Sequence, residues 1–160
     1  MIVVVIIGFI LTISCILITT CLVNKANYTF PFEESMDTVK LPIISFEHKG
    51  KIVNFIIDSG STHSIIEKNY IEEFEYMTAT NAKGYVRGIN GEKVETTLAR
   101  VELVKDGHIF SDVFQVLPVP TLKMQEQKHG IKIHGLLGSQ FLKKYRFLIN
   151  YKYLNACTNG

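Results

Sequence analysis

The sequence predicts one all-β domain, a sandwich or a barrel, behind an apolar N-terminal segment. The length of 160 residues allows one domain of ordinary size. Short runs rich in Ile and Val alternate with turn signals through most of the chain, and no charged side chain precedes Lys25. The near balance of 17 basic and 15 acidic residues gives no electrostatic reason to expect nucleic-acid binding.

Residues 1–23 are an almost continuous run of Ile, Val, Leu and Phe. A helix of about 20 apolar residues spans the bilayer core, so this run predicts a retained, single-pass membrane anchor. A cleaved signal peptide is the alternative, although the run lacks a basic start and a clear cleavage site of small residues. A lipoprotein signal ending at Cys21 is a third interpretation, which Thr20 fits poorly. Lys25 is the only basic residue nearby, so the orientation in the membrane is left open.

Residues 24–39 are polar and contain Pro31 and the acidic pair Glu33 and Glu34, so we expect a linker there. The folded domain is then expected over residues 40–156. The three cysteines have no spacing typical of a disulfide framework or a zinc site.

The domain opens with a hairpin and a short helix. Ile- and Val-rich runs at 41–46 and 51–57 flank a turn at residues 48–50. Apolar residues at near-helical spacing then predict a short helix over residues 64–74.

Two further hairpins surround two-residue turns in which Asn or Asp precedes Gly. In the first, strands at 85–89 and 92–98 flank the turn Asn90-Gly91. In the second, strands at 101–104 and 109–116 flank the turn Asp106-Gly107. Both residue types in such a turn tolerate positive φ, which makes the pair a strong hairpin signal. Pro118 and Pro120 end the last of these strands, because proline cannot donate to a strand ladder.

The C-terminal part is less regular. Residues 121–130 are polar and are expected to form a loop, and residues 131–137 are expected to form a strand. A short helix over 139–145 and a final strand over 146–149 complete the predicted elements.

The most informative stretch surrounds Asp58, which directly follows three apolar strand residues. Such a strand would hold the carboxylate in a partly dry site, and Gly60 would let the backbone fold so that its amides face the carboxylate. Ser59 and Ser61 can add hydroxyl hydrogen bonds. An aspartate held in this way can act as a general base on water if a second carboxylate lies beside it. Taken without its context, the tripeptide is also typical of an ordinary turn after a buried strand.

The context of this stretch adds further signals. Residues 55–62 resemble the active-site signature of aspartic proteases, in which Asp-Thr/Ser-Gly follows a hydrophobic strand. The order of the remaining motifs is similar to that of the single-domain retropepsin-like family: Gly88-Ile89-Asn90-Gly91 stands where that family has its flap, and paired strands follow over 101–117. Residues 134–142 resemble its late apolar-apolar-Gly motif. The resemblance covers about residues 40–154 and implies a closed acid-protease β-barrel with one or two short helices.

The resemblance implies a role for each matching residue. Asp58 would be the catalytic aspartate, and Ser59 stands where the family usually has a Thr that bonds across to the other half of the site. The hydroxyl of Ser61 would bond the carboxylate, and Gly138 would pack behind the active-site loop. The supporting residues are Ser59, Gly60, Ser61, Thr62 and Gly138, and the flap and substrate-binding residues are Gly88, Ile89, Asn90 and Gly91. Ser139-Gln140 replaces a pair that often forms an ion pair in relatives, which leaves the local bracing open.

The number of suitable aspartates predicts the assembly. The implied mechanism needs two aspartates that share one proton. Asp37, Asp106 and Asp112 are not followed by Ser/Thr-Gly, so one chain supplies one catalytic aspartate. We therefore expect a homodimer in which two copies of Asp58 meet on a two-fold axis.

The expected function is that of a membrane-anchored aspartic endopeptidase acting on peptide or protein substrates, with no metal or organic cofactor. His63, His129 and His134 match no strong zinc pattern. The alternative is a non-catalytic peptide- or protein-binding module on the same fold, with Asp58 as a turn residue. A small membrane protein with an accidental signature is the third possibility.

Overall fold

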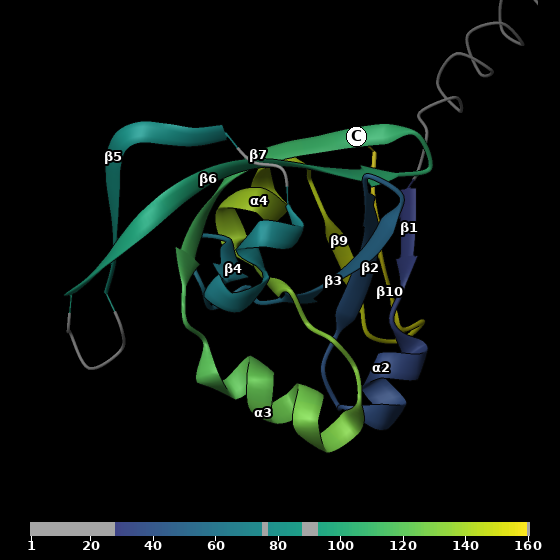
Figure 1. Cartoon of the computed structure of the whole chain (residues 1–160). Helices are drawn as coiled ribbons and strands as arrows, with labels where there is room; N and C mark the ends of the chain where they lie inside the picture. Colours follow the sequence, from purple (N-terminus) through teal and green to yellow (C-terminus); the bar gives the residue numbers. More distant parts are fainter. Residues whose placement is uncertain (1–27, 75–76, 88–92, 160) are drawn as a thin grey trace, which may run out of the picture.

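The computed structural model describes residues 28–74, 77–87 and 93–159 (Figure 1). The predicted anchor, residues 1–23, and the predicted flap tip, residues 88–91, lie outside the described residues. Among the residues that are described, no helix has the length and apolar character needed to cross a bilayer.

In the described part of the chain, six strands close into a barrel. The hydrogen-bonded order is β2-β3-β8-β4-β7-β6, and β6 returns to β2 through the pairing of Val104 with Glu47. β5 pairs with the outer side of β6, and Figure 1 shows these two strands reaching away from the barrel. This closed barrel confirms the predicted fold of the domain. The strands are β2 (Ile43–His48), β3 (Lys51–Ile57), β4 (Ile65–Glu67), β5 (Met77–Arg87), β6 (Lys93–Lys105), β7 (His108–Leu117) and β8 (Gly135–Leu137).

Two of the predicted hairpin turns are confirmed by their backbone angles. Lys49 and Gly50 have φ of 49° and 76°, and Asp106 and Gly107 have φ of 50° and 80°. Positive φ at both central residues is the geometry that matches the twist of two antiparallel strands. β7 ends at Leu117, directly before Pro118, as predicted.

The expected linker contains ordered structure that belongs to the domain. β1 (Tyr28–Pro31) pairs with β10 (Asn155–Thr158), which pairs with β9 (Leu148–Asn150), and α2 (Glu33–Thr38) follows β1. Phe30 and Phe32 are only 1% and 2% exposed. The expectation of a linker is wrong for residues 28–38, because the two aromatic side chains enter the core while the acidic pair lies in the first turn of α2, where the helix dipole favours it.

The region after the Asp58 loop differs from the predicted helix over residues 64–74. Residues 65–67 form β4, which pairs in parallel with β7 and antiparallel with β8. A 3₁₀ helix, η1 (Lys68–Glu73), follows it. The Ile-rich start of this segment is therefore a barrel strand, because both of its edges find partners only when distant parts of the chain come together.

Helix α3 (Pro120–His129) replaces most of the loop that we expected over residues 121–130. Pro120 begins the helix, and Gly130 ends it in the left-handed conformation with φ of 70°. Proline at the first turn and glycine at the end are ordinary helix boundary signals. The helix lacks an apolar face, with Leu122 as its only buried residue, and this weak pattern explains the wrong prediction.

The remaining elements follow the prediction in part. α4 (Ser139–Lys144) is the predicted short helix. β8 is shorter than the strand expected over residues 131–137, and β9 begins at Leu148, after Arg146 with φ of 52°. The described residues thus contain three α-helices and one 3₁₀ helix, more than the one or two helices expected.

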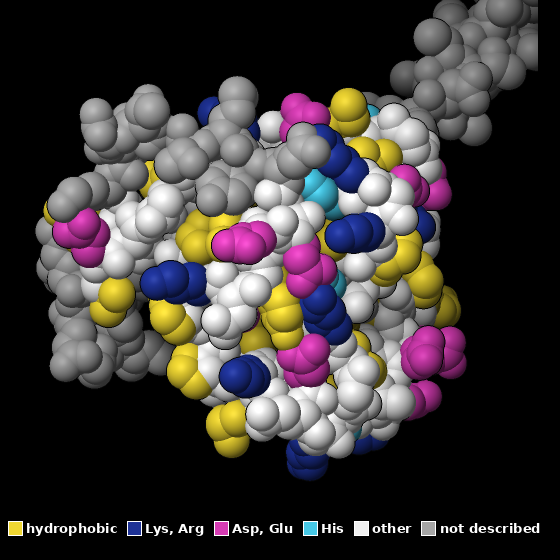
Figure 2. Space-filling view, in the orientation of Figure 1, with side chains coloured by type: hydrophobic (Ala, Val, Ile, Leu, Met, Phe, Trp, Pro, Cys, Tyr) yellow, Lys and Arg dark blue, Asp and Glu magenta, His cyan; other side chains and the backbone are white. Residues whose placement is uncertain are grey.

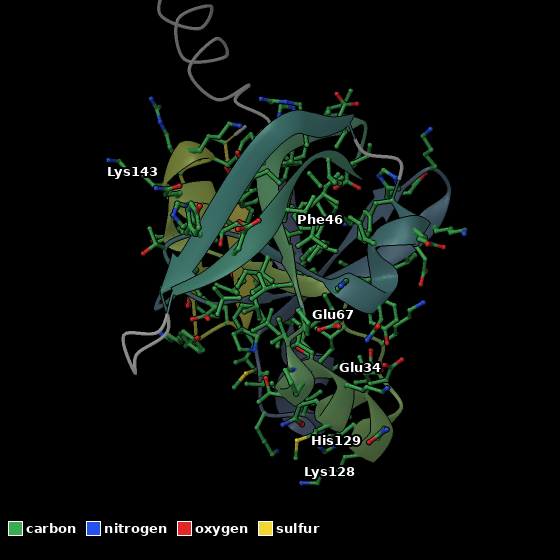
Figure 3. The ribbon with its side chains drawn as sticks, turned by 60° about the vertical axis from the view of Figure 1, so that its left-hand side comes forward. Glu34, Phe46, Glu67, Lys128, His129 and Lys143 are labelled. Carbon is green, nitrogen blue, oxygen red and sulfur yellow. The ribbon has the colours of Figure 1, made fainter. Side chains whose placement is uncertain are left out.

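The core of the barrel is aromatic. Phe46 lies in the interior (Figure 3), with its ring centroid 4.9 Å from that of Phe30 and 5.5 Å from that of Phe110. The first pair of rings is tilted and the second meets edge to face, an arrangement that adds to the gain from burial. Because Phe30 comes from β1, the core joins the barrel to the small β1-β10-β9 sheet and makes them one folding unit.

Candidate active site

Asp58 stands where β3 leaves the barrel. Ile57 before it is buried, whereas Asp58 is partly exposed and the next two residues, Ser59 and Gly60, are exposed. The Asp58 amide donates to the Leu137 carbonyl of β8 at 3.0 Å. The strand thus holds the carboxylate at the barrel surface, where water and a second molecule can reach it.

The main chain of the same loop orients this carboxylate. The Gly60 amide donates to Asp58 Oδ1 at 3.0 Å, and the Ser61 amide donates to the Asp58 carbonyl at 3.2 Å. A Cβ atom on residue 60 would lie 3.3 Å from Oδ1, which is a tight contact. A glycine therefore leaves the carboxylate room to accept the amide.

Helix α4 braces the far side of the Asp58 loop. The Ser139 amide donates to the Ser61 carbonyl at 2.8 Å, and the Gln140 amide donates to the Thr62 carbonyl at 3.2 Å. These bonds use the main-chain amides at the start of α4, which have no partner inside the helix. Ser139 and Gln140 replace the residues that often form an ion pair in relatives, and here their main-chain amides brace the loop instead.

Gly138 packs directly behind the loop. A Cβ atom on this residue would lie 2.5 Å from the carbonyl carbon and oxygen of His63. The Gly138 amide also donates to Ser64 Oγ at 3.1 Å. Only a residue without a side chain allows α4 to approach so closely. The contacts of the loop thus link these predicted site residues: Asp58, Gly60, Ser61, Thr62 and Gly138.

The hydroxyl of Ser61 does not bond the carboxylate, so this expectation is wrong. Its Oγ donates to the His63 carbonyl at 2.8 Å. The turn that brings the Ser61 amide back to the Asp58 carbonyl leaves the side chain over its own downstream backbone. Ser59 is exposed, on the outer side of the same turn.

An open pocket of about 420 Å³ adjoins Asp58. One wall comes from the chain around β2, β3 and β8, and the opposite wall comes from the start of α3. The lining residues are Leu41, Pro42, Ile56, Ile57, Asp58, Val119, Thr121, Leu122, Gln125, Leu136 and Tyr151. Most of this lining is apolar, and pockets of this size and character are typical of ligand sites.

Sequence reasoning missed the α3 wall and Tyr151 of this pocket. The signal for α3 was present in Pro120 and Gly130, which mark the two ends of the helix. Tyr151 follows β9 at a turn, 93 positions after Asp58 in the printed sequence, and no local pattern relates the two. Their proximity is set by the packing of the small β1-β10-β9 sheet against the barrel.

A polar cluster fixes η1 beside β8. His134 is 2% exposed, and its Nδ1 accepts a hydrogen bond of 3.0 Å from the main-chain N–H of Asn54. Burial lowers the pKa of His134 to about 4, so the imidazole is neutral near pH 7. Lys132 forms an ion pair with Glu73 of η1, which lowers the pKa of that carboxyl group. Figure 2 shows acidic, basic and histidine side chains lying side by side on this face.

The same region ties α3 to the barrel. The Tyr70 hydroxyl of η1 donates to Glu126 of α3, and burial raises the pKa of Tyr70 to about 12. Glu67 is 3% exposed and accepts the Val119 amide just before α3 (Figure 3). Buried carboxylates are stabilised by such hydrogen bonds. The helix that walls the Asp58 pocket is thus held at both its start and its middle.

A comparison with protein families matches residues 44–144 to the family described as "gag-polyprotein putative aspartyl protease". The match spans more than half of the 160 residues. The chain belongs to this aspartyl protease family. A search of curated proteins finds no match. The part of this aspartyl protease domain that matches runs from β2 through α4, so β1, α2, β9 and β10 lie outside it.

Within this aspartyl protease domain, Gly138→Ala is expected to lower the free energy of unfolding by about 1–3 kcal/mol, because the new methyl group overlaps backbone atoms of His63. Urea denaturation of the two proteins measures the difference. Gly107→Ala is the matched control, because nothing lies within 4 Å of its Cβ. Its φ of 80° strains an alanine by about 1–2 kcal/mol, and the lower entropy of the unfolded chain offsets about 0.4–1 kcal/mol of that cost, so the net loss is expected to be smaller than for Gly138→Ala. Equal losses in the two variants would contradict the packing role of Gly138.

Proposed function

We propose that the chain is an aspartic endopeptidase in which two Asp58 carboxylates, one from each subunit of a homodimer, activate the water that hydrolyses a peptide bond. One observation carries the proposal: Asp58 lies at the surface end of a buried strand, oriented by Gly60 and beside an open pocket, in a chain of the aspartyl protease family.

The chemistry follows from two carboxylates that share one proton. Two like charges held close together cannot both ionise, so one Asp58 carries the proton and the other is ionised. The ionised carboxylate accepts a proton from water as that water attacks the peptide carbonyl carbon. The protonated carboxyl group donates its proton to the carbonyl oxygen, and a tetrahedral diol results. As the diol collapses, the carboxyl group that took the proton from water gives it to the amine nitrogen, the other carboxylate takes a proton from a diol hydroxyl, and the C–N bond breaks. No metal or organic cofactor takes part in these steps.

A homodimer supplies the second carboxylate. The other aspartates have different roles: Asp112 pairs with Lys144 at 3.4 Å, Asp106 occupies a tight turn beside Lys105, and Asp37 lies exposed in α2. We also propose that residues 88–91 close over an extended substrate, whose main chain pairs with that of the enzyme on both sides.

We further propose that residues 1–23 anchor the enzyme in a membrane with a single pass. β1 begins at Tyr28, so residues 24–27 connect the anchor to the domain. Four extended residues reach at most about 14 Å, which keeps the domain close to the bilayer. Confinement to a surface raises the effective concentration of the chains and allows a weak dimer to form.

The test measures cleavage of a peptide library by the full chain in detergent micelles at a series of protein concentrations. Pepstatin-sensitive cleavage is expected, with an activity per chain that rises with protein concentration as sedimentation shows dimers forming. Activity per chain that stays constant where all chains are monomers would exclude the shared site. Peptide binding without cleavage, in samples shown to be dimeric, would indicate the binding module instead.

A further inference from the structure

The pocket beside Asp58 has apolar walls and one amide side chain. Ile56 and Leu136 form part of the barrel side, and Leu122, which is 3% exposed, forms part of the α3 side. Such walls favour a large apolar or aromatic side chain. Gln125 reaches the same pocket from α3, one helical turn after Leu122.

Gln125 carries a polar atom whose hydrogen-bonding capacity is unused. Its Oε1 is shielded from solvent and accepts no hydrogen bond among the residues that the structure describes. An unpaired buried acceptor raises the free energy of the protein, and a ligand that donates to it recovers that loss. Rotation of the Gln125 carboxamide can turn this oxygen into the pocket. Because Oε1 accepts no hydrogen bond beforehand, the rotation loses none at that atom.

Helix α3 presents Gln125 from a fixed position. Glu126, the next residue, accepts the Tyr70 hydroxyl, and Val119 at the start of the helix donates its amide to Glu67. A polar group held in an apolar wall discriminates strongly between ligands that satisfy it and ligands that do not. The combination of apolar walls and one acceptor carried by an anchored helix selects a side chain that is apolar along its length and donates at its tip.

We propose that Gln125 determines substrate specificity by accepting a hydrogen bond from the tip of the side chain that fills this pocket. The chemical class is an aromatic side chain with a hydroxyl group, as in tyrosine, next to the scissile bond. This inference rests on the proposed function, since it assumes that the pocket beside Asp58 receives a substrate residue.

The test compares two peptides that differ only in Tyr or Phe beside the scissile bond. Wild-type full chain in micelles is expected to show kcat/KM about tenfold higher for the Tyr peptide, as one hydrogen bond supplies. Gln125→Met keeps the length of the side chain and removes the acceptor, so the ratio is expected to fall to about one. Gln125→Glu keeps an acceptor and is expected to retain the preference for Tyr.

Gln127→Met is the matched control, because Gln127 is exposed on the same helix and does not line the pocket. It is expected to keep the tenfold ratio. An unchanged ratio in Gln125→Met, or a wild-type enzyme that does not distinguish the two peptides, would overturn the inference. Thermal melting of each variant checks that α3 is still folded.

Binding separates this inference from the proposed function. Peptides with a reduced amide at the scissile position, carrying Tyr or Phe, are titrated into wild type, Gln125→Met and Gln125→Glu by calorimetry. Tighter binding of the Tyr peptide that depends on residue 125, in a protein that cleaves nothing, supports the pocket and rejects the endopeptidase. Cleavage that depends on Asp58 together with equal binding of both peptides rejects the pocket assignment and keeps the endopeptidase.

Discussion

Asp58→Asn is expected to lower kcat at least about 10³-fold, because the substitution removes both the general base and the general acid from the dimer. The amide side chain still accepts the Gly60 amide through its oxygen, so the loop geometry is kept. Peptide cleavage and thermal melting are measured on the same preparations. The melting temperature is expected to stay close to that of wild type while the activity disappears.

Asp106→Asn is the control for this substitution. Asp106 lies in a hairpin turn with φ of 50° and its side chain is 65% exposed, and asparagine is well suited to such a turn. Its activity is expected to equal that of wild type. Mixing gives a second check: an excess of the Asp58→Asn chain suppresses the activity of a fixed amount of wild type if the subunits exchange. Pepstatin-sensitive cleavage by Asp58→Asn itself would exclude the mechanism.

Removal of residues 1–39 is expected to destabilise the domain severely, whereas removal of residues 1–26 leaves it folded. The longer deletion removes Phe30 and Phe32, which are 1% and 2% exposed. Loss of a buried Phe side chain costs about 3–5 kcal/mol, and small domains are stable by only about 5–15 kcal/mol. The deletion also removes β1, which pairs with β10 and places Tyr28 opposite Thr158. The edge of β10 is then unpaired, and an unpaired strand edge favours aggregation.

Thermal unfolding and gel filtration of the two truncated chains measure this difference. A chain of residues 40–160 that melts within a few degrees of residues 27–160 would show that β1 and α2 are dispensable. Two point variants refine the test. Phe30→Ala is expected to lower the free energy of unfolding by most of the amount that β1 contributes. Thr29→Ala, at an exposed position of the same strand, is expected to lower it little.

The Asp58 motif was predictable because it is local. A run of apolar residues ending in Asp58, with Gly60 two positions later, specifies a strand, a turn and an amide that faces the carboxylate, and the structure contains each of them. The tight turns at Lys49-Gly50 and Asp106-Gly107 were predictable for the same reason, since their φ angles depend on two neighbouring residues. The start of α4 after Gly138 also followed from a local motif.

The features that could not be predicted depend on contacts between distant residues. Residues 28–38 looked like a linker because their burial depends on β10 and on core residues far along the chain. α3 has almost no apolar face, so its position depends on contacts with distant residues: the Tyr70 hydroxyl donates to Glu126, and Glu67 accepts the Val119 amide. The hydroxyl of Ser61 donates to the His63 carbonyl, a partner that depends on the path of the folded loop.

A few consecutive residues thus determine the chemistry of the candidate site, but they do not determine the shape of its pocket. Asp58 and Gly60 carry their own geometry, because hydrogen bonds within a short turn involve atoms that the covalent chain already keeps close together. The pocket that joins Gln125 and Tyr151 to Asp58 exists only after α3 and the small β1-β10-β9 sheet have packed against the barrel, because its walls come from segments that the covalent chain does not keep close together.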